Sequence, residues 1–182
     1  MCLGGTANVD GGAGMLDVLP ELPAPTRVAC DVDMPLADAV RVFAAQKGAT
    51  PAQFPQLEAR FAPLAAYAEI PGAGAAGGLG AAFASLGAVL RPGAPLILDL
   101  LRFDPASYDL VVTGEGTVDG TTSRGKAPGE VAARCRAAGV RCIVFGGRLV
   151  ARLTGVETVA LSGDPARAAE DLRGLGRLCA PN

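Results

Sequence analysis

The stretch from Thr113 to Pro128, TGEGTVDGTTSRGKAP, places two carboxylates and a lysine close together. Glu115 and Asp119 follow an apolar run that is typical of a β-strand, and Lys126 opens a run with helical spacing. In open parallel sheets, ligands bind at the carboxyl ends of strands, where the next helix presents free backbone N–H groups. The carboxylates could therefore hold a divalent cation, and Lys126 could bind a phosphate or carboxylate. An ordinary solvated βα loop explains the same residues equally well.

Part of this stretch, GTTSRGKA, is one residue short of a P-loop, which requires Ser or Thr where Ala127 stands. A P-loop also follows its strand directly, whereas residues 113–119 separate Val112, the last valine of the expected strand, from Gly120. Both the missing hydroxyl and the displaced position argue against a P-loop.

A second group of charged residues lies in the segments GGTANVDGG, DVDMP and QKG. Asp10 lies among glycines that let a backbone approach a ligand closely, although a turn residue is the alternative. Asp31 and Asp33 lie at the end of an expected strand, with their side chains on the same side of it. There they could bind a metal or accept a proton from a hydroxyl. An Asx-type turn before a helix is their alternative role. Lys47 could bind phosphate, or be a solvated lysine near a helix C-terminus.

The segment PGAGAAGGLGAAF contains Gly74, Gly77 and Gly78 ahead of an apolar run. A glycine loop that leads into a helix N-terminus is a plausible anion site. Close packing of the helix against its neighbours explains the small residues equally well.

Composition restricts the chemistry further. The 182 residues include no histidine, which removes Ser-His-Asp and Cys-His catalysis, and the five cysteines form no C-x-x-C pair that would indicate zinc. Carboxylates, lysines, backbone amides and a hard cation remain, a set that suits phosphoryl transfer. The net charge of -2 without charge runs predicts a small-molecule ligand and no nucleic-acid partner. Neither a membrane span nor a signal peptide is evident, so we expect a cytoplasmic protein.

The pattern of apolar residues predicts a helix-rich N-terminal part. Expected elements are a short helix after the first glycine loop, a strand over 26–33, and helices over 35–45, 51–68 and 81–90. Thr50 and Pro51 are typical of a helix N-terminus, and Pro63 should kink or break that helix. Residues 94–103 fit a strand or a helix, with a slight preference for a helix.

The C-terminal part alternates more regularly. Its pattern predicts a strand over 108–116 that ends in a glycine turn, a helix over 125–139, strands over 140–147 and 157–163, and a final helix over 165–175. Strand, helix and strand in this order predict a right-handed parallel βαβ unit. The change in pattern near residues 103–108 predicts a domain boundary.

Taken in order, seven blocks resemble the signatures of the bacterial type I glycerate kinase family: GGTANVDGGAGM, VACDVDMPL, AQKGAT, PGAGAAGGLGAAF, LRPG, DLVVTGEGTVDGTTSRGKAPGEVA and IVFGG. The resemblance implies transfer of the ATP γ-phosphoryl group to glycerate, generally giving 2-phosphoglycerate, with Mg²⁺. It also implies an α/β fold with a Rossmann-like parallel βαβ portion and a second, smaller α/β domain. Residues 1–105 would be a remnant of the second domain and 106–182 the C-terminal part of the Rossmann-like domain.

The resemblance also implies roles for individual residues. The catalytic set would be Asp10, Asp31, Asp33, Glu115, Asp119 and Lys126, of which Asp31, Glu115 and Asp119 would also hold the metal. The ATP-binding set would be Lys47, Gly74, Gly77, Gly78, Gly114 and Gly116. Carboxylates would orient the attacking hydroxyl, while lysines and glycine amides would offset charge on the phosphoryl group.

The sequence also departs from the family pattern. Family members are longer and carry a D-S-F-K-G strand and a D-G-G-E-G block, and this chain shows neither, so it resembles an N-terminally truncated member. An alternative function is therefore an inactive homologue that acts as an anion- or nucleotide-binding module. Such a module would act as a homo-oligomer or with a complementing chain. An unrelated dinucleotide binder is a weaker alternative, because no G-x-G-x-x-G with a downstream ribose acid is suitably placed.

Overall fold

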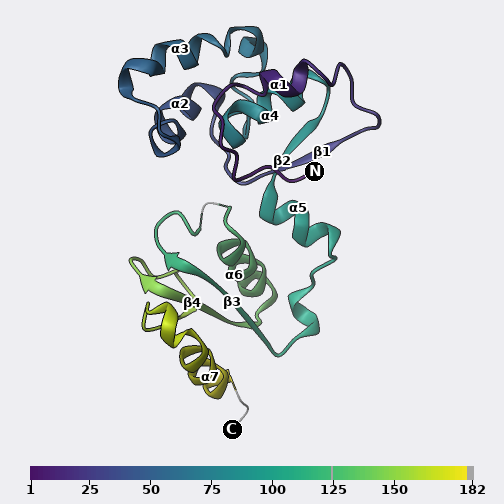
Figure 1. The fold of residues 1–182 in the computed structure, drawn as a ribbon. Helices are drawn as coiled ribbons and strands as arrows, with labels where there is room; N and C mark the ends of the chain where they lie inside the picture. Colours follow the sequence, from purple (N-terminus) through teal and green to yellow (C-terminus); the bar gives the residue numbers. More distant parts are fainter. Residues whose placement is uncertain (124, 180–182) are drawn as a thin grey trace. The chain divides into compact units, whose positions relative to one another are not determined.

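The computed structural model describes residues 1–123 and 125–179, and the chain divides into two compact units, Met1–Ile97 and Leu98–Asn182 (Figure 1). The first unit contains a two-stranded sheet and the second a three-stranded sheet, and all strand pairs are parallel. These sheets confirm the predicted α/β class with parallel strands. Which family domain each unit represents stays a prediction from the sequence.

The sheet of the first unit is built on β1 (Arg27–Cys30), which pairs with β2 (Val89–Pro92). The backbone N–H of Leu3 donates to the carbonyl of Ala29 at 2.8 Å, so the N-terminal segment also pairs with β1. The last three residues of β1, Val-Ala-Cys, are at most 4% exposed, which confirms the buried strand expected from the sequence. This central strand positions the residues that follow it.

The strand β2 corrects one expectation. The apolar run over 81–90 predicts a continuous helix, but helix α4 (Ala75–Ser85) ends at Ser85, and Val89 begins β2. Gly87, at φ 86°, turns the chain between the two elements. A short apolar run fits a buried helix and a buried strand equally well, so its composition alone does not locate this boundary.

The remaining helices of the first unit are short. Regular α-helix is confined to α1 (Ala13–Leu16), α2 (Ala39–Phe43) and α3 (Phe54–Ala59), and 3₁₀ turns extend them at Leu36–Asp38, Ala45–Lys47, Pro51–Gln53 and Ala62–Tyr67. The expected break before Pro63 is confirmed, because α3 ends ahead of it. Thr50 caps its turn as expected, with its N–H donating to Gln53 Oε1 at 2.8 Å.

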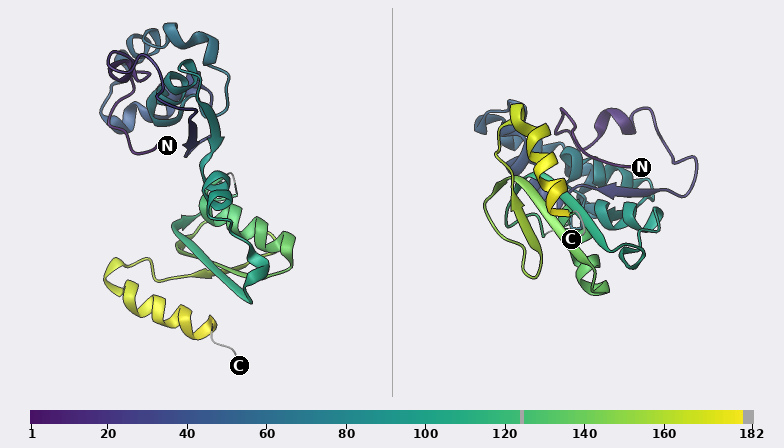
Figure 2. Two further views of the ribbon diagram at one scale, coloured as in Figure 1. Left: turned by 90° about the vertical axis from the view of Figure 1, so that its right-hand side faces the viewer. Right: turned by 90° about the horizontal axis from the view of Figure 1, so that it is seen from below.

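The second unit contains the predicted parallel βαβ arrangement. Its strands are β3 (Leu110–Val118), β4 (Arg141–Leu149) and β5 (Glu157–Ala160), in the order β3-β4-β5. Helix α6 (Ala127–Ala138) connects β3 to β4 and packs on both, and Gly139, at φ 69°, ends it as expected. Helix α5 (Gly93–Leu100) spans the boundary between the two units, and helix α7 (Ala168–Cys179) belongs to the second. Figure 2 shows α7 lying away from α6.

The segment TGEG is strand throughout, whereas the sequence predicts that the strand over 108–116 ends in a glycine turn. Strand β3 continues through Gly114, Glu115 and Gly116, because β4 pairs alongside with Glu115 opposite Gly146. A methyl group on Gly114 would lie 2.6 Å from the carbonyl oxygen of Phe145. Glycine here permits close pairing of the two strands. In the sequence alone, such a glycine cannot be told from a glycine in a turn.

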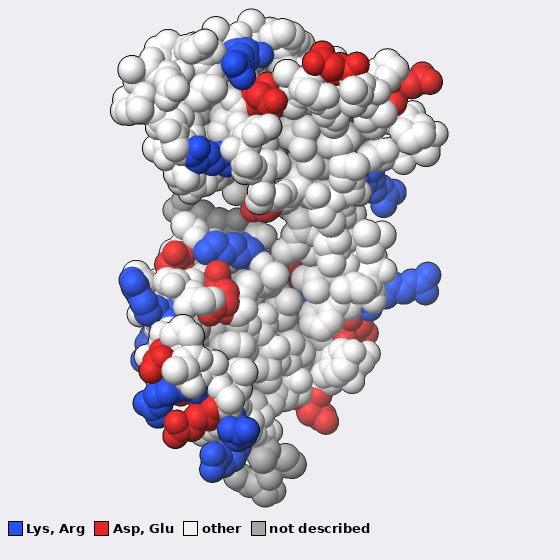
Figure 3. Space-filling view, viewed as in Figure 1, with Lys and Arg blue, Asp and Glu red and all other residues white. Residues whose placement is uncertain are grey.

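Two further properties concern helix length and surface charge. Within residues 1–123 and 125–179, no helix is long and apolar enough to cross a lipid bilayer. On the face drawn in Figure 3, acidic and basic side chains are interspersed.

Candidate functional site

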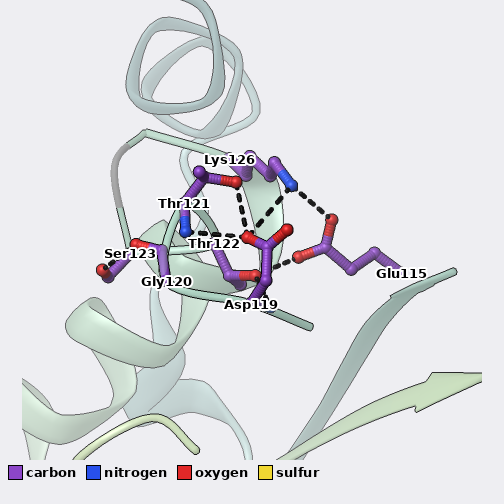
Figure 4. A network of polar contacts seen from close by, with 7 residues as sticks. All are labelled: Glu115, Asp119, Gly120, Thr121, Thr122, Ser123 and Lys126. Carbon is purple, nitrogen blue, oxygen red and sulfur yellow. Dashed lines mark hydrogen bonds and ion pairs between the residues drawn. The ribbon is translucent and has the colours of Figure 1, made fainter. Parts of the chain in front are cut away.

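The loop between β3 and α6 brings three predicted residues together. The Lys126 Nζ lies 3.2 Å from Glu115 Oε2 and 3.8 Å from Asp119 Oδ1 (Figure 4). Glu115 extends from β3, Asp119 follows the strand directly, and Lys126 is the residue before α6. The carboxyl end of a parallel strand and the N-terminus of the next helix therefore meet at this cluster, as the sequence predicts.

The Asp119 carboxylate holds the loop in shape. Its Oδ1 accepts hydrogen bonds from the Thr121 hydroxyl at 2.6 Å and from the Thr121 backbone N–H at 2.7 Å. These two bonds, the hydroxyl first, and the charge of Lys126 hold the pKa of Asp119 below its ordinary value. Asp119 is therefore a stable anion inside an Asx-type turn.

Thr122 connects the two carboxylate residues, although the sequence did not single it out. Its side chain is fully buried, and its hydroxyl donates to Glu115 Oε1 at 2.5 Å and accepts from the Asp119 N–H at 3.0 Å. The motif Asp-Gly-Thr-Thr, in which hydroxyls follow an aspartate at turn spacing, is the signal that could have identified it.

Helix α6 supports this loop through close backbone contact. A methyl group on Gly129 would overlap the carbonyl oxygen of Thr122, so only glycine lets the first turn of α6 approach the loop. Lys126, three residues earlier, is thereby fixed beside the carboxylates.

The oxygen ligands in this cluster fit Mg²⁺. Magnesium binds through one or two protein carboxylates together with substrate phosphates and water, and Glu115 and Asp119 provide two carboxylates on adjoining elements. Among the residues that the structure describes, no group of three or more Cys, Asp or Glu side chains gathers to form a metal cage. Asp31, the third expected ligand, lies in the first unit, and its role as a ligand stays a prediction.

A second cluster lies in the first unit, around a pocket of about 120 Å³. Its lining is formed by Gly5, Thr6, Asp31, Phe43, Gln46, Lys47 and Ala76. The pocket thus joins the first glycine loop, the residue after β1, the QKG turn and the start of α4. Sequence separates these four segments widely, and the packing of the first unit brings them together.

Lys47 is the cation of this pocket. Its Nζ donates to Thr6 Oγ1 at 3.0 Å and to the Asn8 carbonyl at 2.8 Å, and lies 5.7 Å from the Phe43 ring centroid. Burial lowers the pKa of Lys47, while the charges of Asp31 and Asp10 act in the opposite direction. Thr6, Asn8 and Phe43 were not predicted, since only tertiary packing places them beside this lysine.

Asp10 and Asp33 lie differently from the other predicted carboxylates. Asp10 Oδ1 accepts the Gly12 N–H at 3.0 Å, the turn contact that was its alternative role. Asp33 is exposed, and among the described residues neither aspartate lines the pocket. Their predicted catalytic roles stay predictions.

The glycines at the start of α4 pack against the chain itself. A methyl group on Gly74 would lie 2.5 Å from the Pro35 carbonyl, and one on Gly77 would overlap the Asn8 carbonyl. Gly78 is equally crowded, 2.9 Å from Gly11 Cα. These contacts fix the loop that supplies Asn8 to Lys47, and nucleotide binding by the three glycines stays a prediction. Gly116, in β3, has open space around it.

The fold and the two clusters define an α/β protein with a lysine beside carboxylate and hydroxyl groups in each unit. Residues 20–164 match the model of the family described as "Glycerate kinase family". The chain therefore belongs to the glycerate kinase family.

Individual relatives are similar over most of this chain. A glycerate kinase of Bacillus cereus is 36% identical, with 80% of this chain and 50% of the relative covered. Glycerate 2-kinase of Escherichia coli is 36% identical over 69% of this chain and 45% of the relative. An uncharacterized protein of Mycobacterium bovis is 38% identical over 81% of this chain and 44% of the relative.

A solved structure is also similar. The crystal structure of a putative glycerate kinase 2 from Salmonella typhimurium superimposes with a TM-score of 0.68 and 31% identity, over 94% of this chain and 58% of that chain. The chain spans about half the length of the curated relatives it matches.

Proposed function

We propose that this chain takes part in ATP-dependent phosphorylation of glycerate, with 2-phosphoglycerate as the product. The observation that carries the proposal is the cluster of Lys126, Glu115 and Asp119 at the end of β3 and the start of α6, in a chain of the glycerate kinase family. Phosphoryl transfer depends mainly on positioning and on offsetting negative charge, and this cluster offers groups for both tasks.

Each residue has a role in the proposed reaction. Lys126 offsets negative charge on the phosphoryl group, assisted by the positive end of the helix dipole at the start of α6. Glu115 and Asp119 would hold Mg²⁺, which when bound neutralises phosphate charge. Thr122 positions Glu115 through its hydroxyl. Asp31 orients the substrate hydroxyl, and Asp10 stabilises the first glycine loop through the Gly12 N–H. A catalytic role for Asp10 and Asp33 remains part of the proposal.

The test is ADP release measured by a coupled assay with D-glycerate, ATP and Mg²⁺, with NMR identification of the phosphorylated hydroxyl. We expect turnover that Lys126→Ala lowers by about 100-fold to 1,000-fold, since one stabilising donor is lost. An unchanged rate in Lys126→Ala would contradict the proposal. ATP binding without turnover would support instead the alternative of an inactive nucleotide-binding module.

The setting of the reaction belongs to the same proposal. ATP and Mg²⁺ are solutes of the cytoplasm, where we place the protein. The interspersed surface charges of Figure 3 agree with a small-molecule substrate and not with a nucleic-acid partner. A second copy or a complementing chain is the proposed macromolecular partner, and light scattering after size-exclusion chromatography tests for it.

A further inference from the structure

The two lysines of the chain differ in how their charge is balanced. Lys47 and Lys126 are the only lysines in the sequence, and one lies in each candidate cluster. Lys126 has carboxylate oxygens at 3.2 and 3.8 Å. Among the described residues, by contrast, the hydrogen-bond partners of Lys47 are the neutral oxygens of Thr6 and Asn8. In the described part of the chain, Asp31 and Asp10 act on Lys47 through their charge and not through a hydrogen bond, so a bound anion can pair with its ammonium group directly.

Lys47 also has donor capacity for a ligand. An ammonium group has three N–H donors, and Thr6 Oγ1 and the Asn8 carbonyl accept two of them. The contact of Nζ with the Phe43 ring holds the side chain along the pocket wall. In the part of the chain that the structure describes, this partly buried ammonium has one donor left. It is well suited to an anionic oxygen, because hydrogen bonds between charged groups are stronger than those between neutral groups.

The size of the pocket restricts the anion. Its volume of about 120 Å³ is below the roughly 300–1,000 Å³ of pockets that hold drug-sized ligands. A small organic acid fits this volume, whereas a whole nucleoside triphosphate is larger than it. The pocket thus matches the acceptor substrate better in size than it matches ATP.

Asp31, which lines the same pocket, adds a selection among small acids. A carboxylate accepts hydrogen bonds but donates none. It therefore favours a ligand hydroxyl and repels a second ligand carboxylate. Lys47 and Asp31 together select a monocarboxylate that carries hydroxyl groups.

We propose that this pocket is the hydroxy-acid subsite, in which Lys47 binds the carboxylate of glycerate and Asp31 accepts a hydrogen bond from its hydroxyl. The assignment rests on the proposed function for the identity of the acid. It replaces the ATP-binding role that the family resemblance implies for Lys47. Lys126 then serves the nucleotide phosphates alone.

The two lysines allow a direct test by NMR. Protein labelled with [ε-¹³C]lysine has two lysine side-chain signals, which Lys126→Met assigns by removing one of them. We expect D-glycerate to shift the Lys47 signal and ATP with Mg²⁺ to shift the Lys126 signal. Glycerate that shifts only Lys126 or neither lysine, or ATP that shifts Lys47, would overturn the subsite.

Binding measured by calorimetry gives a second readout. Lys47→Met should weaken glycerate binding about 10-fold to 100-fold, with ATP affinity unchanged. Asp31→Asn should improve binding of the dicarboxylate tartronate relative to glycerate. The matched control is Arg41→Met, which removes an exposed cation outside this pocket and should leave both affinities unchanged. Equal loss in Arg41→Met and Lys47→Met would contradict the assignment.

These measurements separate the subsite from the reaction. Glycerate that shifts Lys47 in a protein without turnover would support the subsite while contradicting the proposed activity. Turnover in a protein in which glycerate shifts only the Lys126 signal would support the proposed activity and contradict the subsite.

Discussion

The ammonium group of Lys126 lies 3.2 Å from Oε2 of Glu115, although the two residues are 11 positions apart. Glu115 is held from the other side by the Thr122 hydroxyl, so a helix-start lysine and a buried loop residue fix one strand carboxylate between them. The geometry of this cluster therefore depends on the loop as much as on the charges, and the loop can be tested separately.

Lys126→Arg separates charge from shape. Arginine keeps the positive charge but replaces a compact ammonium with a planar fork, so we expect it to recover only part of the turnover lost in Lys126→Ala. Because the lysine side chain is 39% exposed, its ion pairs should contribute less than about 1 kcal/mol to the free energy of unfolding. Steady-state kinetics and urea unfolding measure the two effects. Full activity of the arginine variant would show that the charge at position 126 matters and the compact shape of the Lys126 ammonium group does not.

Thr122→Val tests the buried hydroxyl. The change preserves shape but removes the donor to Glu115 and the acceptor of the Asp119 N–H, so we expect a loss of about 1–3 kcal/mol in the free energy of unfolding. Thr117→Val, which removes a hydroxyl of β3 outside the network, is the control. Equal stability losses in the two variants would show that the network contributes nothing specific.

Gly129→Ala tests the approach of α6 to the loop. Alanine ordinarily stabilises a helix by about 1 kcal/mol relative to glycine, but here its methyl group would overlap the Thr122 carbonyl. We therefore expect a destabilisation of about 1–3 kcal/mol. Gly120→Ala, in the same loop with open space around it, should change the free energy of unfolding by less than about 0.5 kcal/mol. Thermal unfolding of the two variants decides the matter.

The lowered pKa of Asp119 predicts a dependence of stability on pH. Because the folded-state pKa is below the ordinary value of 3.8, the contribution of this carboxylate is fully present above that pH. It is lost as the pH falls below 3.8 through the folded-state pKa. The stability difference between the wild type and Asp119→Asn should thus shrink from pH 6 to pH 3 in urea unfolding, and a constant difference would exclude the carboxylate as its cause.

Cysteine labelling tests the burial of both cores. Burial raises the pKa of Cys30 to about 11 and that of Cys142 to about 12, so their reactive thiolate forms are scarce at pH 8. Cys2 is exposed and should react with iodoacetamide first. Peptide mass spectrometry after timed labelling measures the order, and rapid labelling of Cys142 in the folded protein would contradict the structure.

The sequence determined the local parts of the site. Strand, loop and helix follow one another within residues 108–139, so apolar spacing and helix signals were enough to place Glu115, Asp119 and Lys126 at one strand end. Contacts between residues close in sequence depend on the local secondary structure, and the spacing of apolar residues predicts that structure. The same reasoning was wrong for β2 and for the TGEG segment, since glycine has the same signature in a turn as in a close strand pair.

Only the tertiary structure decided the surroundings of the two lysines. Lys47 donates a hydrogen bond to Thr6, which is 41 positions away in the sequence. Thr122 is buried because Gly129 lets α6 approach the loop. Such contacts arise where glycine lets two backbone segments approach closely and where the core packs tightly. Short patterns in the sequence predict neither of these. The sequence thus determined which ionisable groups could do chemistry. The packing of each unit decided that Lys126 is paired with carboxylates, whereas the hydrogen bonds of Lys47, in the described part of the chain, go to neutral oxygens beside a small pocket.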